Sequence, residues 1–259
     1  MARVARDSLP AVVLLDLDDT LFDHSYTARA ALAAVRRDSG ALRGRSLNQV
    51  WEEYLVLLDA IHPDVLAGRI SLEDARRERF RRLAVFCGAD LSPAEARDLS
   101  QLYRAAYQNE RRAVPGARAL LERLHGRTTV AIVSNNRLRE QDEKLAYLGL
   151  RGWIDVLVVS EEVGVPKPDP RIFEVALERA GAAAADAVMF GDSWTSDVLG
   201  ARSAGVPAVW FNRFRLPNPE PGAVREVRSL RDPVRVERAL SGAKAGDRRT
   251  RRFRAGRTS

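Results

Sequence analysis

Five short runs rich in Val, Ile, Leu and Ala recur along the chain, each about as long as a β-strand. Nearly every residue within a run is apolar, so the runs lack the alternation expected of a strand with one solvated face. Continuous apolar runs are typical of strands buried on both faces of a parallel sheet. The predicted strands span residues 11–15, 130–134, 156–160, 187–191 and 208–212.

Helical patterns lie between the last four of these runs, and a glycine suited to a helix C-terminus follows each of them. The predicted helices cover residues 137–148, 171–180 and 196–204, and a last one covers 232–240 after a proline-rich loop at 213–222. Strands that alternate with helices form βαβ units, whose helices cover both faces of a sheet. The sequence therefore predicts an α/β core with a doubly wound, Rossmann-like parallel sheet.

The interval between the first two strands has a different pattern. It contains no convincing strand but four amphipathic helical stretches, at residues 25–37, 47–61, 72–86 and 93–112. Ser71 before Asp74, and Ser92 before Glu95, are helix start signals. We therefore expect a catalytic core formed by residues 1–22 and 113–240, with an all-helical domain inserted at residues 23–112.

Composition and charge change this picture only at the C-terminus. The net charge is +7 over 259 residues, yet residues 241–259 alone hold seven Lys or Arg and one Asp. We expect this basic tail to be disordered and accessory, and contact of the tail with nucleic acid stays open as the less favoured alternative. The single Cys87 excludes an internal disulfide, and the apolar run at 11–15 is too short for a signal peptide or a membrane span. The expected location is the cytoplasm, with no membrane partner.

Acidic residues directly follow the first and fourth predicted strands. Asp16, Asp18 and Asp19 come after the first, and Asp192 and Asp197 after the fourth. In an open parallel sheet, ligands bind at the carboxyl ends of the strands. Like charges gathered there destabilise the fold unless a cation offsets them, so a divalent metal is expected.

The other two strand ends carry complementary chemistry. The second predicted strand ends at Ser134 and Asn135, which offer a hydroxyl and backbone N–H groups for phosphoryl oxygens. The third is followed by Lys167, which lies between two prolines that restrict the backbone around it. Carboxylates, a hydroxyl and a cation together predict a site for a metal ion and a phosphate.

These four segments resemble the four motifs of the haloacid dehalogenase (HAD) superfamily of phosphohydrolases. The resemblance covers about residues 12–212, and the helical insertion lies where that superfamily has its C1 cap. The stretch at residues 158–168, followed by Ile172 and Phe173, is similar to the branch of pyrimidine 5'-nucleotidases and N-acylneuraminate-9-phosphatase. The resemblance implies hydrolysis of a small phosphate monoester, either a nucleoside monophosphate or a sugar phosphate.

The resemblance also implies catalytic roles. Asp16 would attack phosphorus and form an aspartyl-phosphate, while Asp18 would protonate the leaving oxygen and later deprotonate the hydrolytic water. Ser134, with Asn135, would hold the phosphoryl oxygens, and Lys167 would offset the negative charge.

A metal site follows from the same resemblance. Mg²⁺ would lie between Asp16, the backbone carbonyl of Asp18 and Asp192. Asp197 would either support the metal or orient Lys167.

Alternatives stay open at this point. A phosphotransferase or phosphomutase would use the same aspartate, and a non-catalytic HAD-fold protein could bind nucleic acid through the tail. Dehalogenation is disfavoured because a departing halide needs no acid, which leaves Asp18 without a role. The chain could be a monomer or a homodimer.

Residues of the insertion add further candidates. The histidines are expected on the surface or in the insertion, and His24 is the one near enough to Asp16 in sequence to be weighed for the site. Most of an arginine-rich stretch should be a solvated helix face, although one member could meet substrate. That stretch holds Arg69, Arg76, Arg77, Arg79, Arg81 and Arg82. Four aromatic residues at helical spacing are expected in the core of the insertion: Trp51, Tyr54, Tyr103 and Tyr107.

Overall fold

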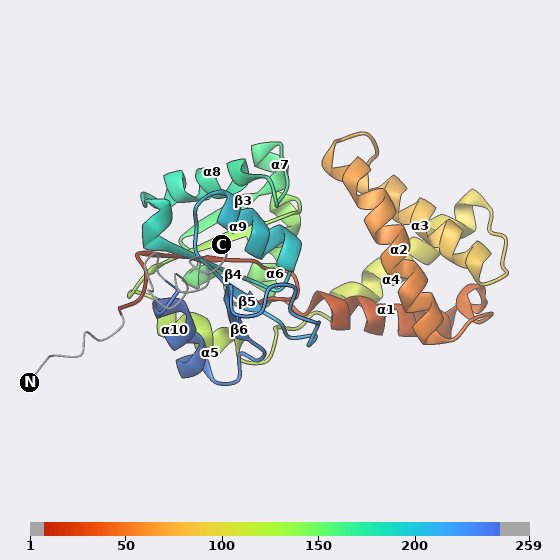
Figure 1. The fold of residues 1–259 in the computed structure, drawn as a ribbon. Coiled ribbons are helices and arrows are strands. Elements are labelled where there is room, and N and C mark those ends of the chain that lie inside the picture. The colour runs from red at the N-terminus through yellow and green to blue at the C-terminus, as the bar shows by residue number, and fades with distance from the viewer. Residues whose placement is uncertain (1–7, 244–259) are drawn as a thin grey trace, which may run out of the picture. The chain divides into compact units, whose positions relative to one another are not determined.

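In the computed structural model, residues 8–243 are described, and the chain forms two compact units (Figure 1). One unit combines Met1–Phe22 with Ala113–Ser259, and the other is Asp23–Arg112. The predicted tail at 241–259 lies outside the described residues apart from its first three. Over residues 8–243, no helix combines the length and hydropathy that a membrane crossing requires.

The first unit, the core, is built on a six-stranded sheet in which every neighbouring pair is parallel. The strand order is β3-β2-β1-β4-β5-β6, which is that of a doubly wound fold. The strands are β1 (Val12–Leu15), β2 (Thr129–Ser134), β3 (Val156–Val159), β4 (Ala187–Gly191), β5 (Ala208–Phe211) and β6 (Arg225–Val227). The predicted α/β fold class is confirmed.

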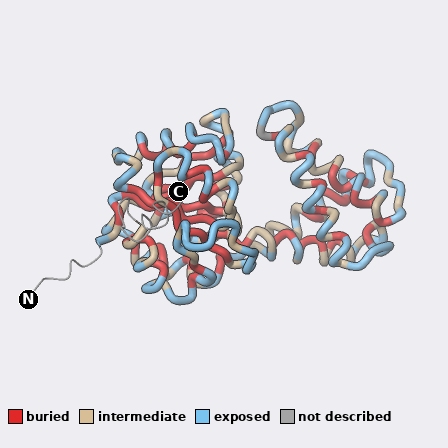
Figure 2. The backbone as a smooth tube through the Cα atoms, in the orientation of Figure 1, coloured by how far each residue is buried: buried red, intermediate tan, exposed pale blue. Residues whose placement is uncertain are grey.

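Burial explains why the apolar runs became strands. Every residue of β1, β4 and β5 is buried. Figure 2 shows buried residues, in red, gathered at the centre of this unit. Alternate residues serve opposite faces of the sheet. Val12 and Leu14 pack in one cluster with Ile172 and Phe173 of α8, which lies across β1, β2 and β3.

Helices complete the layers of the core. α5 and α10 pack together, and Figure 1 shows them on the side of the sheet opposite α8. The helices are α5 (Ala117–Leu124), α6 (Leu138–Tyr147), α7 (Ser160–Val163), α8 (Pro170–Ala180), α9 (Gly200–Ser203) and α10 (Pro233–Ser241). The regular helix expected at 196–204 is wrong in its first half, because residues 194–199 form a wide π-helical turn before α9.

The second unit, the helical cap, contains α1 (His24–Asp38), α2 (Leu47–Leu66), α3 (Leu72–Phe86) and α4 (Pro93–Asn109). The predicted start signals are confirmed, since Ser71 Oγ accepts from the N–H of Asp74 and Ser92 forms a capping box with Glu95. α2 continues past the expected end at residue 61 and includes Pro63.

The aromatic residues of the cap form its core. Tyr54 and Tyr103 are buried, their hydroxyls lie 2.8 Å apart, and Trp51 stacks on Tyr54. His24 is engaged within the cap, where its Nδ1 lies 2.8 Å from the hydroxyl of Tyr107.

One arginine of the basic stretch departs from the rest. Arg81 and Arg82 are exposed and pair with Glu78, as expected of a solvated face. Arg79 is buried and donates to the hydroxyl of Tyr54. The sequence could not select Arg79, because every arginine in the run has the same chemistry.

Candidate active site

The carboxyl ends of β1, β2 and β4 meet at a pocket of about 150 Å³ in the core. The chain adds β2 and β3 on one side of β1 and then adds β4, β5 and β6 on the other side. The strand order therefore reverses between β1 and β4, and the pocket lies at this switch point. All seven predicted site residues line the pocket together with two serines. The lining residues are Asp16, Asp18, Ser134, Asn135, Lys167, Asp192, Ser193, Ser196 and Asp197.

A tight turn at residues 19–21 follows the first two carboxylates, Asp16 and Asp18. The N–H of Asp16 still bonds to Phe190 of β4. Asp19 then takes a left-handed conformation with φ 62°, which Asp tolerates better than most residues. Arg213 pairs with the side chain of Asp19, 3.4 Å away, so that carboxylate has its own partner.

Lys167 is the buried centre of the site. Its Nζ donates to Asp16 Oδ1 at 2.6 Å, to Asp197 Oδ1 at 2.7 Å and to the carbonyl of Val133 at 2.8 Å. All three ammonium hydrogens are therefore used. Burial lowers the pKa of Lys167, but Asp16 and Asp197 together raise it above its ordinary value, so the lysine stays charged.

The backbone of Lys167 is clamped by the end of β2. The amide of Asn135 donates to the carbonyl of Lys167 at 2.8 Å and accepts from its N–H at 2.6 Å. The side chain of Asn135 is thus engaged in positioning Lys167. Gly200 allows α9 to approach the same segment, because a Cβ there would lie 2.9 Å from Pro168 Cα.

The wide turn at residues 194–199 brings Asp197 back to the end of β4. Its Oδ2 accepts from the N–H of Ser193 at 2.9 Å, while Oδ1 accepts from Lys167. Gly191 makes room for this carboxylate, since a Cβ at that position would overlap it. Asp197 therefore contacts Lys167 directly, and its expected role, either support of the metal or orientation of Lys167, stays a prediction.

Asp16, Asp192 and Asp197 each offer a carboxylate oxygen within 4.8 Å of the others. Burial raises the pKa of Asp16 to about 7; Lys167 opposes the shift, and the charge of Asp197 adds to it. Burial likewise raises the pKa of Asp192, with further contributions from Asp16 and Asp197. Hard carboxylate oxygens that are crowded in this way fit a divalent cation such as Mg²⁺, whose charge would offset their repulsion.

A pH dependence of stability follows from these shifts. The folded chain keeps protons on Asp16 and Asp192 that the unfolded chain releases from about pH 3.8 upward. In metal-free buffer, Asp16 should therefore lower the free energy of unfolding by about 2–4 kcal/mol between about pH 4 and about pH 7. Urea denaturation at about pH 5 and about pH 8 measures the combined loss from both groups, and Asp16→Asn should remove the part that is due to Asp16. If Asp16→Asn shows the same pH dependence of stability as the wild type, groups other than Asp16 cause that dependence.

Two site residues escaped the sequence analysis. Gln141 and Lys144 lie on α6, are buried, and both donate to the carboxylate of Asp18. The available signal was their three-residue spacing beside Leu145, which puts two polar side chains on the apolar face of a helix.

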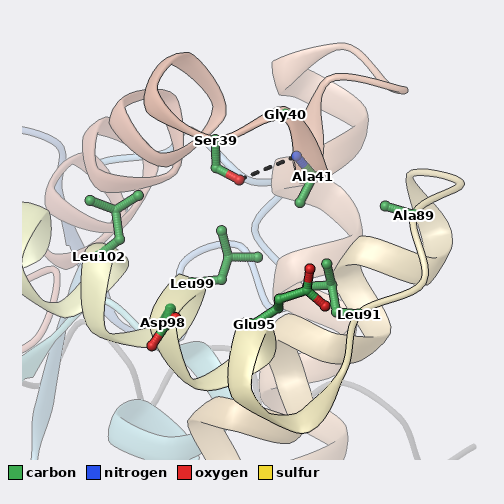
Figure 3. A pocket seen from close by; sticks show the side chains of 9 residues that line it. All are labelled: Ser39, Gly40, Ala41, Ala89, Leu91, Glu95, Asp98, Leu99 and Leu102. Carbon is green, nitrogen blue, oxygen red and sulfur yellow. Dashed lines mark hydrogen bonds between the residues drawn. The ribbon is translucent and has the colours of Figure 1, made fainter.

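A larger cavity of about 620 Å³ lies in the cap, between the end of α1 and α4 (Figure 3). Leucines and two acidic residues line it, and Glu95 is already bonded to Ser92 as a helix cap. Its lining contains neither a cation nor a cluster of three carboxylates. The carboxylate cluster and the buried Lys167 therefore lie at the smaller pocket and not in this cavity.

The fold and the pocket define an α/β enzyme of phosphoryl chemistry, with carboxylates and a lysine at the switch point of a doubly wound sheet. Residues 10–205 match the model of the haloacid dehalogenase-like hydrolases. The chain belongs to that family, and the resemblance inferred from its motifs is confirmed.

Several proteins of known sequence or structure are similar. A phosphoserine phosphatase of Thermus thermophilus is 32% identical over 257 residues, covering 87% of this chain and 98% of that enzyme. The pyrimidine 5'-nucleotidase YjjG of Escherichia coli is 42% identical over 108 residues, covering 41% of this chain and 48% of that enzyme. The HAD-hydrolase YfnB of Bacillus subtilis, solved bound to magnesium, has a TM-score of 0.72 at 24% identity and shares the fold, over 89% of this chain and 100% of that one.

The family and these relatives establish a phosphoric monoester hydrolase. They do not support the alternative of a non-catalytic binding protein.

Proposed function

We propose that this enzyme is a Mg²⁺-dependent phosphatase that hydrolyses a nucleoside monophosphate or a sugar phosphate through an aspartyl-phosphate on Asp16. The observation that carries the proposal is the buried ammonium of Lys167, 2.6 Å from Asp16 at the head of a pocket lined by carboxylates and a hydroxyl. A phosphoryl group that binds beside Asp16 would lie close to the positive charge of Lys167, which is already fixed in position.

The first step transfers the phosphoryl group to the enzyme. Lys167 bonds to Oδ1 of Asp16, and among the described residues no hydrogen-bond donor reaches Oδ2. Oδ2 is therefore the oxygen that forms the new bond to phosphorus while the bond from phosphorus to the ester oxygen breaks. Asp18 gives that departing oxygen a proton.

The second step releases inorganic phosphate. Asp18 takes a proton from water as the water oxygen attacks phosphorus, and the bond between phosphorus and Asp16 breaks. Ser134 Oγ accepts from Gln141 at 2.5 Å, so its own hydrogen is left to donate to a phosphoryl oxygen in both steps.

A metal ion fits the same residues. Asp16, Asp192 and the backbone carbonyl of Asp18 would hold Mg²⁺, beside Asp197. When bound, Mg²⁺ would supply positive charge to the phosphoryl oxygens and to the crowded carboxylates.

The size of the pocket bears on substrate choice. Its volume of about 150 Å³ is below the roughly 300–1,000 Å³ of sites that enclose a whole organic ligand. It is suited to a phosphoryl group, so its lining does not distinguish one monoester from another. The proposed substrate class rests on the similarity to nucleotidases and sugar-phosphate phosphatases.

Removal of metal should abolish turnover. We expect hydrolysis of p-nitrophenyl phosphate in MgCl₂, a loss of at least about 10²-fold in EDTA, and recovery when MgCl₂ is added back. Full activity in EDTA would contradict the proposal.

A substrate panel then tests the finer assignment. It contains nucleoside monophosphates, sugar phosphates and phosphoserine, each assayed for free phosphate with and without a sugar acceptor. The highest kcat/KM should fall on one of the first two classes, with free phosphate as the product. If kcat/KM is highest for phosphoserine, or if the phosphoryl group is transferred to the sugar, the site has another activity.

A further inference from the structure

The carboxylate of Asp18 is held by two side chains of α6 that no motif identified. Lys144 Nζ lies 2.6 Å from Oδ1 and 2.9 Å from Oδ2, and Gln141 Nε2 lies 2.9 Å from Oδ2. The amide of Asn136 adds a longer contact of 3.4 Å. Both oxygens of Asp18 therefore have a fixed orientation relative to α6.

The side chains of Lys144 and Gln141 that make these contacts are buried. The side chain of Lys144 is 8% exposed, its Nζ lies 4.9 Å from the centre of the Phe22 ring, and Gln141 is fully buried. A buried ammonium or amide is costly unless it is bonded to another polar group. At Lys144 the Asp18 carboxylate supplies that partner.

Gln141 also connects two residues of the proposed mechanism. The same Nε2 that donates to Asp18 donates to Ser134 Oγ at 2.5 Å. Among the described residues its Oε1 has no hydrogen-bond donor. This amide is therefore retained at the cost of a buried, unpaired oxygen, which a purely structural position would not require.

Each of the two mechanistic aspartates thus has its own lysine. Lys167 contacts Asp16 from the segment after α7, and Lys144 contacts Asp18 from α6. We propose that Lys144 and Gln141 are positioning residues for Asp18, which hold its carboxylate in the orientation from which it exchanges a proton with the ester oxygen and with water. This inference rests on the proposed function.

The prediction is clearest for the second step. With p-nitrophenyl phosphate, the leaving phenolate is stable and phosphorylation of Asp16 needs little help from an acid, whereas attack by water still needs Asp18. Lys144→Met should therefore release one equivalent of nitrophenolate rapidly and then turn over about 10²-fold more slowly than the wild type. With an alkyl phosphate, whose leaving oxygen needs a proton, the rapid phase should be lost.

Further variants separate positioning from folding. Lys144→Arg keeps a cationic donor and should recover most of the rate. Gln141→Met removes the unpaired oxygen together with the donor, so it should fold at least as well as the wild type and slow turnover about 10-fold. The matched control is Arg139→Met on the same helix, where the side chain is 90% exposed, and its turnover should be unchanged.

A double-mutant cycle decides the proposal. If Lys144 acts through Asp18, Lys144→Met should cost nothing further in an Asp18→Asn background. An equal loss in both backgrounds, or wild-type kinetics for Lys144→Met beside an inactive Asp18→Asn, overturns the positioning role and leaves the phosphatase intact. Wild-type turnover of the Asp18→Asn variant overturns the proposed mechanism, and this inference with it.

Discussion

Asp16→Asn is expected to lower kcat for p-nitrophenyl phosphate by about 10⁴-fold or more, because the amide cannot form the aspartyl-phosphate. The fold should survive. Asn can still accept from Lys167, and the substitution removes one of three carboxylates within 4.8 Å. The loss should therefore appear in kcat, while the thermal transition measured by circular dichroism should stay cooperative, as expected of a folded protein.

The intermediate itself provides the second readout. Wild-type enzyme quenched in acid during turnover should carry one phosphoryl group on the peptide that contains Asp16, detected by mass spectrometry, and Asp16→Asn should carry none. Asp142→Asn is the control, since that carboxylate is 53% exposed and pairs with Arg151 on the surface. A phosphorylated Asp16→Asn variant would show that another residue is the nucleophile.

The part of the fold that the sequence predicts is the part governed by local pattern. The five apolar strands appear where the runs lie, because residues buried on both faces leave no position for a polar side chain. The polar residues that follow them meet at one edge because parallel strands share a direction. Asp16, Ser134 and Lys167 therefore come together as the order of motifs implies.

The features that escaped prediction depend on contacts distant in sequence. β6 has only three residues, and the first of them, Arg225, is exposed, so no apolar run marks the strand. The π-helical turn follows from the return of Asp197 to Lys167, thirty positions away in the chain. The position of Lys144 on the apolar face of α6 indicates burial but not its partner, because Asp18 lies 126 positions away in the chain.

Lys167→Met should cost both activity and stability, because it leaves Asp16 and Asp197 buried without their shared cation. Breaking a buried ion pair on one side typically destabilises a protein by about 3–5 kcal/mol. That loss is expected in the free energy of unfolding from urea denaturation in EDTA. Loss of the charge that faces the phosphoryl group should also lower kcat by about 10²–10³-fold.

The stability deficit of Lys167→Met should depend on pH and on its partner Asp16. Lys167 opposes the rise of the Asp16 pKa to about 7, so without the lysine Asp16 keeps its proton more readily. The stability deficit should therefore be larger at about pH 8 than at about pH 5, where Asp16 is neutral in either protein.

Adding Asp16→Asn to Lys167→Met should restore part of the lost stability, since one unpaired carboxylate is removed. Arg139→Met should change stability by less than about 0.5 kcal/mol as an exposed-cation control. A deficit independent of pH and unaffected by Asp16→Asn would mean that lost packing, and not uncompensated charge, destabilises the Lys167 variant.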